Sequence, residues 1–371
     1  MDILPAREGE GHPADLRAGR PLRQGPGPAG GAVIAILGGG VVGAATAWAL
    51  ARRGRRDVVV FDPRPRGSGS TGRAFGGFRT QQGNALNIAL SLASRPFFEA
   101  RSDRIGFRSV GYLYLAETDE VAAELRSRAE YQREQGLPIE HPDPLTLVPS
   151  LQVSDVVDTN FCALDGVYFP PSVLECFVAE AAEAGAEFRY ECPASPHDLE
   201  AEVLVLCPGP WAREVGSSLQ VELDVIPVER GIFQVGPFDW VSPDVPVTLD
   251  AGSGYHFRQR DGRLLIIGPG DPHQWGHHRD WLEWRLPRAA LERPERQWTG
   301  FYEVTPDHHP LVGLTERPGV WASCGFSGHG VMHSPAVADC LAAMILGDTP
   351  PIDISALSPL RDQALVDVTQ L

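Results

Sequence analysis

The chain has 371 residues, 43% of them hydrophobic and 22% charged, an ordinary globular composition that is long enough for two domains. Its net charge of −16 disfavours nucleic acid and anionic membranes as partners, and no run approaches the roughly 18 apolar residues of a transmembrane segment. Six scattered cysteines without a C-x-x-C pair argue against a zinc site or a secreted disulfide framework, and they favour the reducing cytoplasm.

Residues 1–31 are rich in Gly, Pro and Arg and have no hydrophobic periodicity. Several acidic residues and the lack of an apolar core disfavour a secretory or transit leader. We expect a disordered N-terminal extension.

A glycine-rich turn follows the apolar run 32–37, which predicts a buried strand. The turn G-G-G-V-V-G at 38–43 leads into a predicted helix at 44–53, and a second predicted strand at 57–61 ends at Asp62. This order of strand, turn, helix, strand and acid is typical of a dinucleotide-binding βαβ unit.

Each residue of this motif has a physical role. Gly38 permits the tight turn, Gly40 lets the backbone approach a pyrophosphate, and Gly43 lets helix and strand pack closely. The phosphates would meet free N–H groups at the helix N-terminus, and Asp62 can accept hydrogen bonds from a ribose. The residues themselves leave open whether the dinucleotide is NAD or FAD.

Further along the chain, helical and strand-like segments alternate. A Gly/Ser/Arg-rich loop at 67–79 is followed by predicted helices at 84–100, 119–135 and 171–184, and by strands at 112–115 and 203–206, the last ending at Pro208-Gly209-Pro210.

From about 221 to 302 the pattern is β-like, with a hairpin signal at 260–262, and a strand, turn and helix return at 320–346. The predicted fold is therefore α/β (α+β overall), with a discontinuous Rossmann-like dinucleotide-binding domain and a second, antiparallel-sheet substrate domain. The expected boundaries are 32–90, 150–217 and 303–371 for the first domain, and 91–149 and 218–302 for the second. We expect a ligand cleft between the two domains.

Four segments in this order resemble the D-amino-acid oxidase family of flavoproteins, and most of all its sarcosine oxidase branch. They are the first glycine motif, G-S-T-G-R at 69–73, T-P-D-H-H-P-L-V-G at 305–313 and G-F-S-G-H-G at 325–330. The likeness spans about residues 32–360.

The resemblance implies that the cofactor is FAD. The positions that match the family's cofactor contacts are Gly38, Gly40, Gly43, Asp62, Ser70, Thr71, Arg73, Gly209, Gly325, Gly328, Gly330 and Met332. Relatives that attach flavin covalently use a Cys or a His where Gly300 and Arg73 stand here, so we expect non-covalent FAD. In this family a hairpin or meander usually precedes the strand that corresponds to the one at 203. Here about a dozen residues take its place, which removes part of the wall of the cofactor site on the adenine side.

The same resemblance indicates the substrate site. Arg79 matches the Arg that binds the substrate carboxylate, while the family's Lys position falls on Met332. Tyr255 and Tyr302 match residues that face the flavin, although core tyrosines of a sheet are an equal alternative. Four C-terminal histidines lack a metal-ligand spacing, so no metal is expected, and His329 is interpreted as a structural residue of its turn.

Relatives that react with oxygen place cations where a simple alignment puts Ile266 and Gly76. Without a cation to stabilise superoxide-like charge, we expect slow reaction with oxygen and favour a dehydrogenase with an unidentified electron acceptor. The expected reaction is oxidation of the C–N bond of a secondary amine or amino acid by hydride transfer to FAD. The alternative is a catalytically weak relative that serves as a flavoprotein assembly or scaffold factor.

Overall fold

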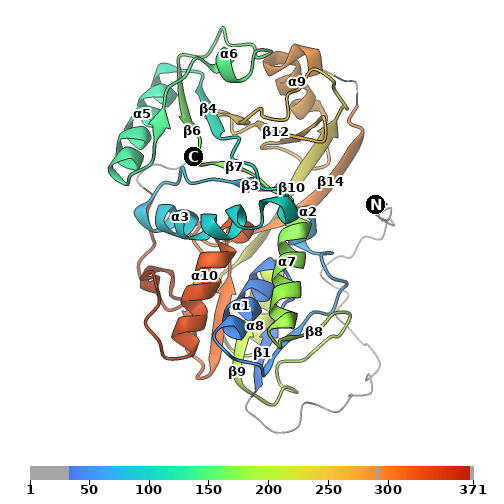
Figure 1. The fold of residues 1–371 in the computed structure, drawn as a ribbon, viewed down its shortest axis with the longest axis vertical. Coiled ribbons are helices and arrows are strands. Elements are labelled where there is room, and N and C mark those ends of the chain that lie inside the picture. The colour runs from blue at the N-terminus through green and yellow to red at the C-terminus, as the bar shows by residue number, and fades with distance from the viewer. Residues whose placement is uncertain (1–32, 290, 292, 368–371) are drawn as a thin grey trace. The chain divides into compact units, whose positions relative to one another are not determined.

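Two large β-sheets organise the chain in a computed structural model, which describes residues 33–289, 291 and 293–367 (Figure 1). The extension expected at 1–31 lies outside the described residues. Among the helices described, none combines the length and the apolarity needed to cross a membrane.

The first sheet has six strands in the order β15-β16-β9-β1-β2-β8. All neighbouring pairs are parallel except β15 and β16. The strands are β1 (Val33–Leu37), β2 (Val58–Phe61), β8 (Glu187–Arg189), β9 (Ala201–Leu206), β15 (Leu311–Leu314) and β16 (Val320–Cys324). This is the expected Rossmann-like sheet.

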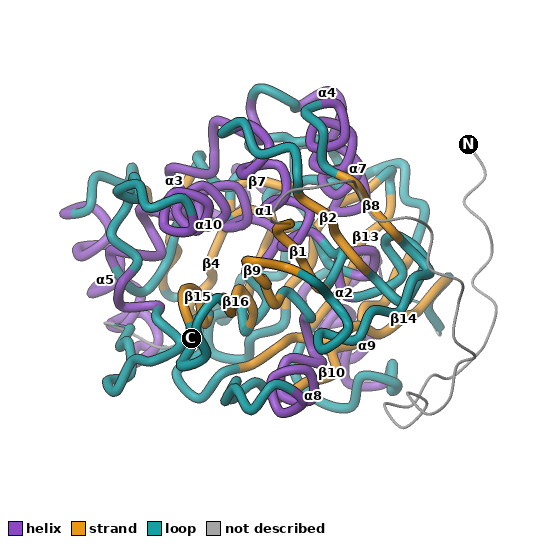
Figure 2. Tube along the Cα trace, turned by 90° about the horizontal axis from the view of Figure 1, so that it is seen from below, coloured by secondary structure: helices purple, strands orange, loops and turns teal. Residues whose placement is uncertain are grey.

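Helices cover both faces of this sheet, as Figure 2 shows for α1, α7 and α10 on one side and α8 on the other. Their bounds are α1 (Val41–Arg52), α3 (Ala85–Glu99), α7 (Pro170–Glu183), α8 (Ala212–Ser218) and α10 (Gly330–Ile345). Within β1, Ile34 and Ile36 pack in the cluster with α1, while Ala35 and Leu37 pack in the cluster with α8. Burial on both faces explains why the strand reads as a continuous apolar run.

The second sheet has eight strands in the order β14-β10-β13-β12-β11-β4-β6-β5, and all of its neighbours are antiparallel except β11 and β4. Its strands are β4 (Tyr112–Ala116), β5 (Ile139–Glu140), β6 (Asp158–Cys162), β10 (Ile226–Val235), β11 (Val247–Asp250), β12 (His256–Arg260), β13 (Arg263–Ile267) and β14 (Arg296–Val304). The remaining elements are β3 (Gly77–Phe78) paired with β7 (Gly166–Val167), and helices α2 (Ser70–Arg73), α4 (Ser102–Ile105), α5 (Asp119–Glu134), α6 (Pro144–Leu147) and α9 (Gly276–Arg285).

The two faces of the second sheet have different neighbours. On the inner face, Tyr112, Tyr114, Leu265 and Ile267 form one cluster with Phe75 from the loop after α2. On the outer face, Leu113, Leu115, Leu264 and Ile266 pack with Trp281 of α9. Because side chains alternate along a strand, a shift of one residue moves a side chain from one face to the other.

One expected domain boundary falls too early. Strand β6 at 158–162 lies in the segment assigned to the FAD-binding part, yet it pairs with β4 in the second sheet from Tyr112↔Cys162 to Ala116↔Asp158. The chain therefore leaves the second sheet after Cys162 rather than near residue 150. The described residues form one compact unit.

Candidate active site

The turn after β1 makes backbone contacts that only glycine allows. Gly38 has a φ of +109°, and a Cβ there would lie 2.0 Å from the carbonyl oxygen of Cys207. A Cβ on Gly43 would lie 1.9 Å from the carbonyl oxygen of Gly38, so α1 packs directly on the turn. Gly40 is the N-cap of α1 and offers no side chain to its N–H groups, which suits an anion at this helix end.

Asp62 lies beside this turn, at the end of β2. Its carboxylate accepts hydrogen bonds from the N–H of Gly39 at 2.8 Å and from the N–H of Arg64 at 2.9 Å. The hydroxyl of Tyr190 donates to the carbonyl oxygen of Gly39 at 3.0 Å. No strand occurs at 190–200, between β8 and β9, so the crossover is short and Tyr190 lines this end of the turn.

Polar atoms without partners mark the path expected for a dinucleotide. Thr71 of α2 accepts a hydrogen bond from the N–H of Val41 at 3.1 Å, which places α2 beside the start of α1. The hydroxyl of its neighbour Ser70 is buried and has no hydrogen-bond partner among the described residues. Such an atom fits a ligand with phosphate oxygens, because a buried hydroxyl that is left unpaired is costly.

A second unpartnered oxygen belongs to Glu303 of β14. Burial raises the pKa of this carboxyl to about 7, although the N–H groups of Gly325 and Phe326 act in the opposite direction. Oε2 of Glu303 is buried without a partner in the described structure, 3.9 Å from where a Cβ on Gly209 would lie. The sequence analysis did not select Glu303. A hydroxyl of a ligand lying along Gly209 would supply the missing hydrogen bond, so these residues fit FAD.

The positions where relatives attach flavin covalently face each other. A Cβ on Gly300 would lie 3.2 Å from the Cβ of Arg73. Arg73 donates from Nη1 to the carbonyl oxygen of Thr299 at 3.1 Å, and its own carbonyl accepts from Trp298 Nε1 at 3.1 Å. Arg73 therefore joins α2 to β14.

Arg79 lies between the second sheet and the start of α10. Its Nη1 donates to the hydroxyl of Tyr114 at 2.9 Å, and its Nη2 lies 2.9 Å from Nε2 of His329. Because a guanidinium only donates, Nε2 of His329 must be the unprotonated nitrogen. Burial and the charge of Arg79 hold the pKa of His329 well below its usual range. Both partners of Arg79 are therefore neutral, and its charge is available to an anionic ligand.

Asp165 fixes the loop that carries Arg79. This fully buried carboxylate accepts from the N–H and the hydroxyl of Thr80 and from Nε2 of Gln81. Burial raises its pKa to about 6, although these hydrogen bonds act in the opposite direction. Met332 lies on the other side of the loop, where its sulfur is 3.4 Å from the backbone nitrogen of Arg79.

Tyr302 shares this site. A Cβ on Gly328 would lie 2.9 Å from its ring, and the N–H of Ser327 donates to the carbonyl oxygen of the next residue, Glu303, at 3.0 Å. Helix α10 then begins at Gly330 with His329 as its N-cap. The predicted residues Arg79, Tyr302, Gly328, Gly330 and Met332 thus come together at one helix start.

Tyr255 does not join them. It packs on the outer face, where its ring stacks on Trp281 at 5.5 Å and its hydroxyl donates to the carbonyl oxygen of Pro269. Ile266 is on the outer face too, so it is not the residue that replaces a cation beside the flavin. The next residue of the strand, Ile267, is the one on the inner face. The inner face instead presents His256 and Arg258 from β12, which pair with Ile267 and Leu265 of β13.

Arg258 is a buried cation that the sequence analysis missed. Its Nη1 donates to the carbonyl oxygens of Phe75, Gly76 and Tyr168. A Cβ on Gly76 would lie 2.7 Å from that nitrogen, so the guanidinium occupies the space a side chain at 76 would need. Burial lowers its pKa to about 10, which leaves it charged at neutral pH. The alternation of H-F-R-Q-R at 256–260 is the signal that would have placed it.

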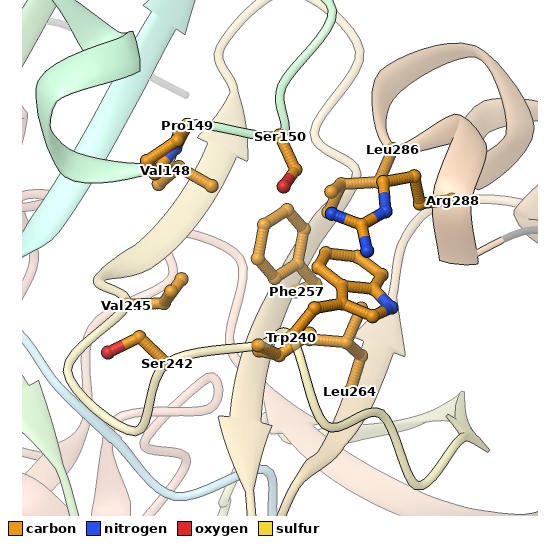
Figure 3. Close-up of a pocket in the computed structure, with 11 residues that line it drawn as sticks. Val148, Pro149, Ser150, Trp240, Ser242, Val245, Phe257, Leu264, Leu286 and Arg288 are labelled. Carbon is orange, nitrogen blue, oxygen red and sulfur yellow. The ribbon is translucent and has the colours of Figure 1, made fainter.

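A separate cavity of about 280 Å³ opens on the outer face (Figure 3). Phe257 and Leu264 line it from the sheet, and the guanidinium of Arg288 lies 4.6 Å from the ring centre of Trp240 at its edge. The sheet separates this cavity from Arg79. Within the described residues, no three His, Cys, Asp or Glu side chains are grouped so that they could hold a metal ion.

Comparison with known proteins gives the class. Residues 34–344 match the model of the family described as FAD dependent oxidoreductase, and the chain belongs to this family. It is 27% identical to glycine oxidase of Geobacillus kaustophilus, covering 90% of this chain and 98% of that protein. It is 28% identical to human mitochondrial dimethylglycine dehydrogenase, covering 88% of this chain but only 44% of that longer protein.

Solved structures agree on the fold. L-proline dehydrogenase from P. horikoshii superposes with a TM-score of 0.81 at 24% identity, covering 88% of this chain and 96% of that one. Glycine oxidase from Geobacillus kaustophilus gives 0.79 at 24% identity, covering 89% and 98%. The expected family, fold and cofactor FAD are confirmed, and the protein is an FAD-dependent oxidoreductase.

Proposed function

We propose that this enzyme oxidises the C–N bond of a secondary amine or amino acid that carries a carboxylate, with hydride transfer to non-covalently bound FAD. The observation that carries the proposal is the guanidinium of Arg79, which hydrogen-bonds to Tyr114 and His329 and forms no direct ion pair among the described residues. A carboxylate would supply the missing negative charge and accept a charge-assisted pair of hydrogen bonds.

The cofactor and the protein have separate tasks. Bound FAD supplies the hydride acceptor. Arg79 holds the carboxylate, and Tyr302 beside Gly328 closes the site against water. The N-terminus of α10 at Gly330 directs N–H groups at the place where negative charge develops, since a helix start carries partial positive charge.

We further propose a dehydrogenase, with an electron acceptor other than oxygen. Leu265 and Ile267 are the buried residues of β13 on the inner face, and both are aliphatic, while Arg263 at the start of the strand is paired with Glu295. The cation of the neighbouring strand, Arg258, directs Nη1 at three backbone carbonyls rather than at open space. A buried superoxide-like charge would therefore find little stabilisation from this strand.

The test is anaerobic reduction of the purified holoenzyme by N-methyl and secondary amino acids, followed by turnover with a dye or quinone. We expect bleaching of the flavin by carboxylate-bearing amines and fast turnover with the dye. A holoenzyme that is not bleached by any of them would refute the proposed reaction and favour the scaffold alternative, which the short β8–β9 crossover supports.

A further inference from the structure

His256 lies in register with the tyrosine that binds Arg79. Four neighbouring strands of the second sheet place one residue each in the same register. In order across the sheet these are Tyr114 of β4, Leu249 of β11, His256 of β12 and Ile267 of β13. Tyr114, Leu249 and Ile267 belong to the inner-face cluster, so the imidazole is on the inner face, two strands from Tyr114. Two interstrand spacings amount to about 10 Å, and Leu249 lies between the two side chains, so a small amino acid that reaches both would lie over Leu249.

The tautomer of His256 is fixed. Nδ1 lies 3.0 Å from the carbonyl oxygen of Gly254, which can only accept, so Nδ1 carries the hydrogen and Nε2 keeps its lone pair. The ring meets the ring of Phe75 edge-on, with centroids 5.0 Å apart. Nε2 has no hydrogen-bond partner among the described residues, although the side chain is only partly exposed.

The surroundings keep this imidazole neutral. Burial and the charge of Arg79 lower the pKa of His256 to about 4. The ionisable groups on the same inner face include Tyr112 and Tyr114 of β4, together with Arg258 and Arg260 of its own strand. The carboxylate of Asp250 on the adjacent strand instead binds Trp281 and Arg285 with the outer-face helix α9. At neutral pH, Nε2 is therefore an uncharged hydrogen-bond acceptor.

We infer that Nε2 of His256 accepts a hydrogen bond from the amine N–H of the substrate, so that the site selects unprotonated amines that carry at least one N–H. This inference rests on the proposed function, in which Arg79 holds the carboxylate. The environment that disfavours a charged imidazole also disfavours an ammonium group, whose proton goes to solvent before binding. With its N–H held by His256, the nitrogen keeps its lone pair to form the C=N bond as the hydride leaves the adjacent carbon for FAD.

The test compares His256→Leu, which removes the acceptor, with His256→Gln, which retains one that does not titrate. His278→Leu is the matched control. His278 is buried, like His256 it has Nδ1 beside a backbone carbonyl (Gln274, 3.2 Å), and it packs with Tyr255 and Phe233 away from Arg79. The substrates are the primary, N-methyl and N,N-dimethyl forms of one amino acid. A carboxylate without an amine is titrated against the flavin absorbance as a binding readout that does not depend on turnover.

We expect His256→Leu to lower kcat/KM for substrates with an N–H by about tenfold or more, the effect of one lost hydrogen bond, with little change for the N,N-dimethyl form. Binding of the amine-free carboxylate should be unchanged, His256→Gln should restore most of the rate, and His278→Leu should not alter the preference among the three substrates. In the wild type and in His256→Gln, kcat/KM should rise with pH as the substrate ammonium deprotonates.

Two outcomes would overturn the assignment of His256. One is an unchanged substrate preference in His256→Leu while the wild type is active. The other is an equal loss of affinity for the amine-free carboxylate, which would indicate a structural role. A flavin-loaded wild type that oxidises none of the three amines would instead overturn the proposed function, and the inference with it.

Discussion

Replacing Arg79 by Met should remove the carboxylate-binding charge while keeping a side chain of similar length. Among the described residues the guanidinium hydrogen-bonds to Tyr114 and His329 and forms no direct ion pair, so we expect the substrate carboxylate to be the ionic partner that the variant loses. Truncating one member of a desolvated charge pair costs about 2–5 kcal/mol, which corresponds to a fall in kcat/KM of roughly 30-fold to several thousandfold.

The assay is steady-state turnover with a dye acceptor, with FAD content measured from the absorbance of the purified variant. We expect the Michaelis constant to rise strongly and FAD content to stay the same, because Arg79 lies on the substrate side of the loop that Asp165 holds through Thr80 and Gln81. Arg79→Lys should retain part of the affinity, since it keeps the charge without the forked geometry. An unchanged Michaelis constant in Arg79→Met would place the carboxylate elsewhere and refute the reasoning.

Further predictions concern cofactor, oxygen and stability. Acid precipitation should release intact FAD into the supernatant, and a yellow pellet would show a covalent link instead. Stopped-flow reoxidation should be slow in air and fast with a quinone. Ile267→Lys should speed the oxygen reaction, because it places a cation on the inner face. Ile266→Lys should only destabilise the fold by a few kcal/mol, because it buries a charge on the outer face. Equal oxygen rates in the two variants would contradict this assignment of faces. Burial would raise the pKa of Asp307, but Arg361 and nearby N–H groups hold it at about 2, below the ordinary 3.8. The Asp307–Arg361 pair should therefore add about 2 kcal/mol to the free energy of unfolding above pH 4, and this contribution should be lost as the pH falls toward 2. The free energy of urea unfolding should then differ between Asp307→Asn and the wild type at pH 7 and become similar near pH 2.

The first βαβ unit was predictable because its constraints are local. Gly43 is required by its contact with the carbonyl oxygen of Gly38 within the turn, and Asp62, directly after its strand, binds the N–H of Gly39. Such contacts leave a fixed spacing in the sequence. The T-P-D segment was recognised from the resemblance as well, but the sequence did not indicate what its Asp307 does. The partner of Asp307 is Arg361, 54 residues away.

The faces of the second sheet were not predictable to the same degree. In G-Y-H-F-R both alternating sets contain an aromatic ring, so the pattern alone does not decide whether Tyr255 or His256 faces the cofactor. The answer comes from long-range packing, namely Trp281 of α9 against Tyr255 and Phe75 against His256. The alternation at 256–260 puts Arg258 on the same face as His256, but its partners are backbone carbonyls, which leave no pattern in the sequence from which its burial could be predicted.

The loop that carries Arg79 is anchored at both ends. Arg258 holds the carbonyls of Phe75 and Gly76 on one side, and Asp165 holds Thr80 on the other. The guanidinium of Arg79 is therefore preorganised, and a substrate need not spend binding energy on ordering it. A change in the preferred chain length of the substrate acid should therefore come from residues on the strands that face Arg79, because Arg79 itself is held in place.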